Sequence, residues 1–185
     1  GSPHHGTFHA FVANGENAAH GKGLTAKTAD ELFAAGIDWL TTGDHCFDQA
    51  AAIDDCYGGA RNIIRPANYS ADAPGRGFAI IPTSHGDVLL MNLIGRVFMP
   101  RQFDDPFRKA EEILANFTDK QFSAILAEIH AEATAEKIAL RHFLDGQVSA
   151  LIGTHTHVQT ADQQITKKGS GYLSDAGMTG FADGV

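Results

Sequence analysis

The sequence has 185 residues, 43% of them hydrophobic and 19% charged, which is the size and composition of one globular domain. Its 14 basic and 22 acidic residues give a formal net charge of -8. That charge argues against a basic face for long nucleic acid or an anionic membrane, although metal ions could hold a small phosphorylated substrate. With two cysteines and no apolar run near the roughly 18 residues of a membrane span, we expect a reduced, cytoplasmic protein.

Short apolar runs alternate with helix-like segments along the whole chain, and this alternation predicts an α/β fold. The segment from Gly58 to Gly86 is rich in Gly, Pro, Asn and Asp, so we expect it to be mostly loop. No repeat or linker divides the chain. The predicted strands span residues 8–13, 39–42, 88–94, 123–129, 148–152 and 171–173.

Three segments have the apolar spacing of helices. Thr25 is the predicted N-cap of the first, and Gly36 and Gly146 are placed to end the first and third in a left-handed conformation. In the third helix, Phe143 and Leu144 are expected to face a core. The predicted helices span residues 25–35, 107–117 and 134–145.

Polar side chains follow four of the predicted strands. In α/β sheets, ligands bind beyond the carboxyl ends of the strands, so these side chains are candidates for a shared site. Any one of them alone would more often be a turn residue or a hydrogen-bonded structural histidine. Their common placement favours a site. In chain order they are Glu16, Asn17, Asp44, His45, His130, His155 and His157.

The chemistry of this set is that of a metal centre. His155 and His157 are two residues apart, and in an extended segment both would face the same side. Imidazole, carboxylate and amide ligands without thiolate suit Mn, Fe or Zn and disfavour a structural zinc site, while Cys46 is interpreted as a packed thiol. A carboxylate such as Glu16 can bridge two ions, as in binuclear phosphatases.

Eight segments in register resemble one known family. They are ANGENAA, GKGLT, TTGDHCFD, RPANY, PGRGF, IHAEATAEKIAL, GTHTHVQTAD and DAGMTG. Together they resemble the YmdB-like family of bacterial calcineurin-type metallophosphoesterases. The resemblance implies a four-layer α/β sandwich, with two sheets flanked by helices and a dinuclear metal centre at the strand ends. It also implies hydrolysis of phosphodiesters, with 2',3'-cyclic AMP and 3',5'-cyclic AMP as substrate types.

The resemblance also implies a role for each candidate residue. Glu16 matches the bridging carboxylate, and His45 matches a catalytic histidine that stabilises developing charge or protonates the leaving oxygen. The other expected metal ligands are Asn17, Asp44, His130, His155 and His157. The expected substrate-binding residues are Arg65, Asn68 and Arg76.

The sequence departs from the family pattern in two places. The family begins with a strand ending in Gly-Asp that supplies a ligand, whereas this sequence begins GSPHHGT. We therefore expect a single domain over residues 1–185 that lacks the first strand and is incomplete at its N-terminus; its end at Val185 also comes early. The alternative is that His4, His5 or a neighbouring subunit supplies the missing ligand. Asp44 stands where the family has asparagine. The added negative charge is expected to lower activity by repelling phosphate.

The leading functional hypothesis is a metal-dependent phosphodiesterase that hydrolyses cyclic nucleotides or related diesters through a dinuclear metal-bound hydroxide. Fe or Mn are the expected ions, with Zn or Mg as alternatives. Two other hypotheses remain: a catalytically impaired binding or regulatory protein, and a hydrolase of phosphomonoesters. The resemblance also implies a homo-oligomer, in which a neighbour would cover sheet edges.

Overall fold

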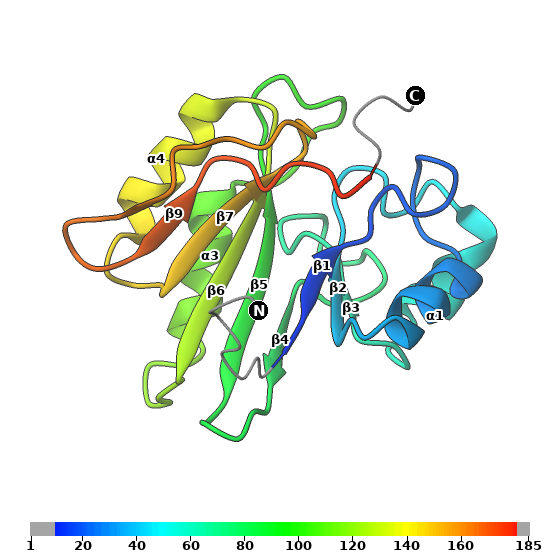
Figure 1. Ribbon diagram of the computed structural model, residues 1–185, viewed down its shortest axis with the longest axis horizontal. Helices are drawn as coiled ribbons and strands as arrows, with labels where there is room; N and C mark the ends of the chain where they lie inside the picture. Colours follow the sequence, from blue (N-terminus) through cyan, green and yellow to red (C-terminus); the bar gives the residue numbers. More distant parts are fainter. Residues whose placement is uncertain (1–9, 181–185) are drawn as a thin grey trace, which may run out of the picture.

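Two β-sheets pack against each other in the computed structural model, which describes residues 10–180 (Figure 1). The smaller sheet contains three parallel strands in the order β1-β2-β3. These are β1 (Val12–Asn14), β2 (Trp39–Thr41) and β3 (Ile63–Ile64). Phe8 and His9, within the first predicted strand, lie outside the described residues, as do His4 and His5.

The larger sheet has six strands in the order β4-β5-β6-β7-β9-β8. Strands β5, β6, β7 and β9 are parallel, and β4 and β8 are antiparallel edge strands. The bounds are β4 (Phe78–Ile81), β5 (Val88–Ile94), β6 (Ala124–His130), β7 (Ala150–Thr154), β8 (Gln164–Ile165) and β9 (Gly171–Leu173). The parallel strands of each sheet therefore send their carboxyl ends to one rim.

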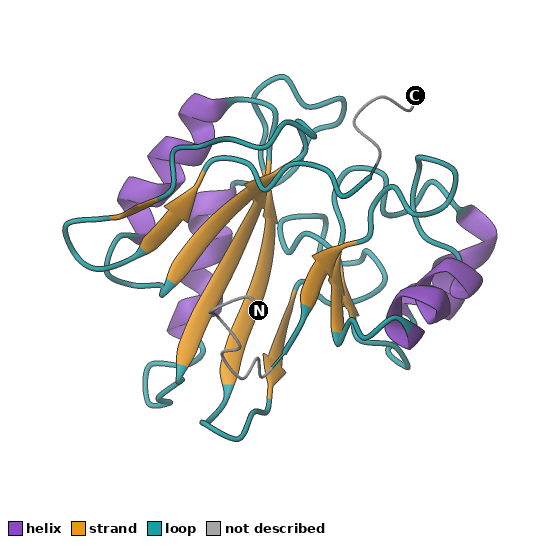
Figure 2. Ribbon diagram, in the orientation of Figure 1, coloured by secondary structure: helices purple, strands orange, loops and turns teal. Residues whose placement is uncertain are grey.

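The helices lie on the outer faces of the two sheets (Figure 2). The helices are α1 (Ala26–Ala34), α2 (Ile53–Tyr57) after a 3-10 turn (Ala50–Ala52), α3 (Pro106–Ala115) and α4 (Thr134–Leu144). Helices α1 and α2 cover the smaller sheet, and α3 and α4 cover the larger sheet. Among the described residues, no helix has the length and apolar composition of a membrane span.

Three apolar cores lie between the layers. Because successive residues of a strand point to opposite faces of its sheet, neighbouring residues belong to different cores. In β2, Leu40 packs toward α1 and α2, whereas the preceding Trp39 packs between the two sheets. In β5, Leu90 belongs to the core between the sheets, and its neighbours Leu89 and Met91 face α3 and α4. The order of layers is helices, sheet, sheet, helices, which confirms the four-layer sandwich implied by the sequence resemblance.

Most predicted elements are confirmed, including the N-cap of α1 and the glycines that follow α1 and α4. The backbone N–H of Thr28 donates to Oγ1 of Thr25 at 3.2 Å, and Gly36 and Gly146 have φ angles of 102° and 81°. One core assignment was wrong: Phe143 is 38% exposed. Leu144 is fully buried, and because adjacent helical residues point about 100° apart, Phe143 is turned away from the core.

The prediction of mostly loop for Gly58 to Gly86 missed two strands, β3 and β4. Strand β3 has only two residues, which is too short for a sequence pattern to show. Strand β4 follows Gly77, where a Cβ atom would lie 2.2 Å from the Cα of Ala67. The glycine thus marks a close approach of two backbone segments at the start of a strand.

We predict that Gly77→Ala destabilises the fold by about 1–3 kcal/mol, because backbone would have to move to admit the methyl group. Urea unfolding followed by circular dichroism measures the change. The matched control is Gly171→Ala in β9, where the nearest atom to the new Cβ would be at 3.4 Å and φ is not positive. Equal losses of stability in the two variants would contradict this interpretation.

Candidate metal centre

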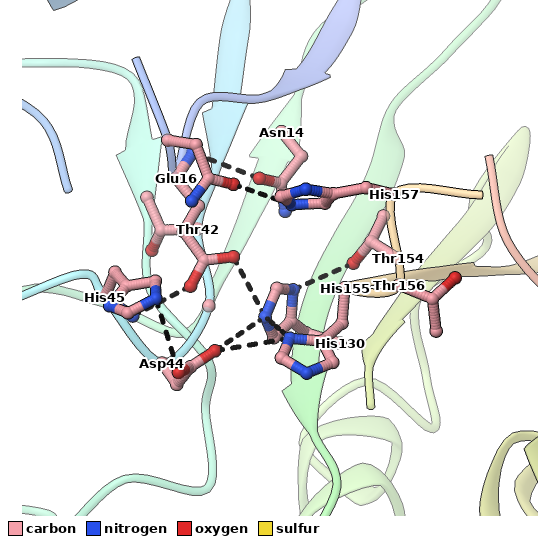
Figure 3. A network of polar contacts seen from close by, with 12 residues as sticks. Asn14, Glu16, Thr42, Asp44, His45, His130, Thr154, His155, Thr156 and His157 are labelled. Carbon is pink, nitrogen blue, oxygen red and sulfur yellow. Dashed lines mark hydrogen bonds and ion pairs between the residues drawn. The ribbon is translucent and has the colours of Figure 1, made fainter. Parts of the chain in front are cut away.

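Side chains from both sheets meet at the rim formed by the carboxyl ends of β1, β2, β6 and β7 (Figure 3). The centre of the group is Nε2 of His130, the last residue of β6. This atom lies 2.9 Å from Oε2 of Glu16, 3.0 Å from Oδ1 of Asp44 and 3.0 Å from Nδ1 of His155. The structure therefore brings together four of the residues predicted from strand ends.

The spacing of these atoms fits a metal site. Ligand atoms bound at about 2.1 Å from one ion lie roughly 3 Å from each other, which is the separation observed around His130. Asp44, His130 and His155 offer donor atoms within 4.8 Å of one another, and so do Glu16, Asp44 and His45. Asp44 belongs to both groups, and the nitrogen and oxygen donors suit Mn, Fe or Zn.

The cluster is buried, and hydrogen bonds within it favour the charged forms of Asp44 and His130. Glu16 is 2% exposed, Asp44 3% and His130 1%. Burial opposes ionisation of Asp44, yet its hydrogen bonds with His130 and His155 hold its pKa well below its usual range. Burial likewise opposes the charged form of His130, but its hydrogen bonds with Asp44 and Glu16 raise its pKa to about 9. Two buried carboxylates thus require a positive charge between them.

Residues beneath the cluster orient His130, and the sequence analysis did not select them. Nδ1 of His130 lies 3.0 Å from Oγ1 of Thr154, whose hydroxyl donates to Oε1 of Glu128 at 2.9 Å. This chain makes Nδ1 the donor and leaves Nε2 to face the cluster. Glu128 is buried, and burial raises its pKa. The sequence did contain a signal for Glu128, because it comes two residues before His130 in the same strand and such residues point to the same face of a sheet.

His45 belongs to a second chain of contacts at the same rim. Its backbone N–H donates to Oε1 of Glu16 at 2.7 Å. Its ring Nδ1 lies 2.7 Å from Oδ2 of Asp48, and Arg101 donates to the other oxygen of that carboxylate at 3.0 Å. Asp48 and Arg101 were not predicted. They fix the ring so that Nε2 of His45 faces the cluster, 3.8 Å from Oδ2 of Asp44.

The two histidines of the His155-Thr156-His157 segment do not act as an extended pair. His155 and His157 have φ angles of 97° and 63°, so the segment is a turn and the extended geometry expected from the sequence was wrong. His155 reaches the buried cluster. His157 lies at its exposed edge, where Nε2 is 3.0 Å from Oδ1 of Asn17. Asn17 and His157 therefore form a separate pair of donors beside Glu16.

The residues expected to bind substrate make contacts within the protein. Arg65 is buried and donates to the carbonyl oxygens of Pro74, Pro66 and Ala73, so it holds its own loop. The side chain of Asn68 is fully buried and satisfied by the backbone of Ile94 and Asp104. The guanidinium of Arg76 stacks on Trp39. These contacts engage Arg65, Asn68 and Arg76 within the fold, and their assignment to substrate binding stays a prediction.

Cys46 is the packed thiol that the sequence predicted. It is 1% exposed, and burial raises its pKa to about 12. A thiol with this pKa supplies no thiolate ligand near neutral pH. The donors at the rim are therefore nitrogen and oxygen atoms.

A two-sheet α/β sandwich with clustered carboxylate and imidazole donors at its strand ends is the architecture of the metallophosphoesterases, and comparisons with known proteins agree. The family model for YmdB-like proteins matches residues 4–185. The chain belongs to the YmdB-like family.

Among its relatives, a Bacillus subtilis protein named 2',3'-cyclic-nucleotide 2'-phosphodiesterase is 46% identical over 177 residues, covering 96% of this chain and 66% of that protein. A Thermus thermophilus structure described as a hypothetical protein is 39% identical with a TM-score of 0.90, covering 96% of this chain and 68% of its own. A Mycoplasma pneumoniae structure described as a novel phosphatase is 32% identical with a TM-score of 0.84, covering 91% and 60%. This chain thus spans about two thirds or less of the curated relatives' length.

We predict that Mn²⁺ stabilises the protein against heat. At a free concentration about 100 times the dissociation constant, one bound ion adds about 2.7 kcal/mol, or about 5–10 °C in Tm for a domain of this size. Differential scanning calorimetry with and without EDTA measures the shift. A Tm that does not respond to Mn²⁺, Fe²⁺ or Zn²⁺ would contradict a metal site at the rim.

Proposed function

We propose that this protein is a metal-dependent phosphodiesterase that hydrolyses cyclic nucleotides or related small diesters. The observation that carries the proposal is the convergence of Glu16, Asp44, His130 and His155 on one point, with His45 beside them. The name of the Bacillus subtilis relative, a 2',3'-cyclic-nucleotide 2'-phosphodiesterase, supports the substrate class.

The residues at the rim would hold two ions in this proposal. Asp44, His130 and His155 would hold one ion, and the family resemblance assigns Glu16, Asn17 and His157 as further ligands, of which Asn17 and His157 contact each other. When bound, such ions supply charge neutralisation for the phosphate and acidify water. The acidic cluster favours the binding of cations, and without them its carboxylates would repel a negatively charged phosphate.

In this proposal His45 donates a proton to the leaving oxygen. The carboxylate of Asp48 accepts a hydrogen bond from Nδ1, so a protonated ring presents its second N–H from Nε2. Arg101 holds Asp48 from the other side and is half-exposed. General acid catalysis by a positioned imidazole needs this kind of fixed ring.

A cavity beside the rim offers space for the organic part of a substrate. It has a volume of about 680 Å³, within the range of small-molecule sites, and its wall includes Arg101, Arg96 and Phe107. Arg101 joins this cavity to His45 through Asp48. The wall carries two arginines, Arg96 and Arg101, and two carboxylates, Asp105 and Glu136, so its formal charges balance.

The proposal is tested by hydrolysis assays of the Mn²⁺-loaded protein with 2',3'-cyclic AMP, bis-p-nitrophenyl phosphate and p-nitrophenyl phosphate. We expect turnover of the diesters and slower turnover of the monoester. Preference for the monoester would favour a phosphatase, the description given to the Mycoplasma pneumoniae structure. Metal binding without turnover of any of the three would favour a binding or regulatory protein.

We predict that His45→Asn lowers kcat for 2',3'-cyclic AMP by about 10²- to 10⁴-fold, the usual contribution of a general acid. The ion held by Asp44, His130 and His155 should still bind, since these donors are unchanged, and metal analysis of the variant checks whether the group of Glu16, Asp44 and His45 has lost an ion. The matched control is His142→Asn on α4, which replaces an exposed histidine on an outer helix. Unchanged turnover in His45→Asn would exclude His45 as the acid.

We also predict that Asp44→Asn raises kcat. A carboxylate near the phosphate opposes it by at least about 1 kcal/mol, which corresponds to roughly a fivefold change in rate. The comparison is made at equal metal loading, verified by metal analysis of both proteins, because the substitution also removes a partner of His130 and His155. An unchanged or lower rate at equal loading contradicts this prediction.

A further inference from the structure

A buried ion pair lies next to the candidate metal centre, and none of the proposed steps uses it. Nζ of Lys137, in the first part of α4, is 2.8 Å from Oδ2 of Asp175, which follows β9. Each residue is 1% exposed. Lys137 comes seven residues after His130, so one continuous segment supplies both the central imidazole of the cluster and this cation.

Both members of the ion pair bind the turn that carries His155 and His157. Lys137 Nζ also donates to the carbonyl oxygen of Thr154 at 2.8 Å. Asp175 Oδ2 accepts from the backbone N–H of Thr156 at 3.1 Å and from its hydroxyl at 2.9 Å. The ion pair therefore holds the residue before His155 and the residue between the two histidines.

The turn needs such support because its backbone is in a rarely adopted conformation. His155 and His157 both have positive φ, 97° and 63°, which side-chain-bearing residues avoid. At Gly153, just before the turn, an added Cβ would lie 2.9 Å from Cδ of Lys137 and would overlap the carbonyl of Ser174. Strained backbone of this kind persists only where its surroundings fix it, and it gathers at functional sites.

Stability alone is a weak explanation for the charges of this pair. Well-packed apolar residues of similar volume often replace a buried ion pair at no cost to stability. What apolar residues could not provide is the set of hydrogen bonds to Thr154 and Thr156. These bonds direct the two imidazoles.

We propose that Lys137 and Asp175 are positioning residues that hold the turn at residues 154–157 so that His155 and His157 face the cluster. They thereby set the affinity for the bound ion. This inference rests on the metal-dependent function proposed above. It concerns residues that touch neither the ion nor the substrate and act only through the two histidines.

The test is the double variant Lys137→Met with Asp175→Leu, which leaves no unpaired buried charge. We expect its dissociation constant for Mn²⁺, measured by isothermal titration calorimetry, to rise about 10- to 100-fold, the usual cost of losing groups that orient ligands. In the metal-free protein, the NMR signals of the His155 and His157 rings should shift, while those of His45 should not.

The matched control is Ser170→Ala, at the opposite end of β9. Ser170 is buried. Its hydroxyl donates to the carbonyl oxygen of Val148 at 2.7 Å and accepts from the backbone N–H of Gly146 at 2.8 Å. Loss of this hydroxyl should lower Tm without changing the turn at residues 154–157. Its dissociation constant for Mn²⁺ should stay within about twofold. If the double variant does not fold, Thr156→Val removes one bond to Asp175 and should raise the dissociation constant several-fold.

Wild-type affinity in the double variant, or in Thr156→Val where only that variant folds, overturns the inference. So does an equal loss of affinity in Ser170→Ala, because the effect would then be general destabilisation. A wild-type protein that binds no Mn²⁺ contradicts the proposed function instead. In that case the NMR signals of the metal-free histidines still decide whether the ion pair positions them.

Discussion

The structure depends on one costly arrangement, two buried carboxylates that share a single imidazole. Glu16 and Asp44 come from the smaller sheet and His130 from the larger one, so their contacts cross from one sheet to the other. The carboxylate oxygens of Glu16 and Asp44 lie within 4.8 Å of each other, and buried negative charges this close repel each other unless a cation lies between them. Protonated His130 meets that requirement, and a metal ion would meet it equally well.

The two-sheet topology explains how this arrangement arises. Parallel strands β1 and β2 deliver Glu16 and Asp44 to the rim, and parallel strands β6 and β7 deliver His130 and the His155 turn. The rim lies where the two sheets approach each other, above a core that includes Trp39 and Leu90 (Figure 1). Burial by packed layers on both sides then supplies the low dielectric that makes the electrostatics of the cluster strong.

The sequence predicted the fold class, most strands, three helices and the residues at the rim, because apolar periodicity and strand ends are local signals. It did not predict the turn geometry at His155 and His157, since a positive φ in histidine depends on tertiary contacts with Lys137 and Asp175. The same limit applies to Arg65. Its place in a segment that resembles a family motif suggested substrate binding, but only the folded loop shows that carbonyl oxygens accept hydrogen bonds from its guanidinium.

The central claim is that the cluster around His130 binds a transition metal. Anomalous diffraction from a crystal grown with Mn²⁺ tests it most directly, because it locates the ion itself. We predict a peak within bonding distance, about 2.0–2.3 Å, of Asp44 Oδ1, His130 Nε2 and His155 Nδ1. An anomalous map with no peak at this rim, or with manganese bound only elsewhere on the protein, would contradict it.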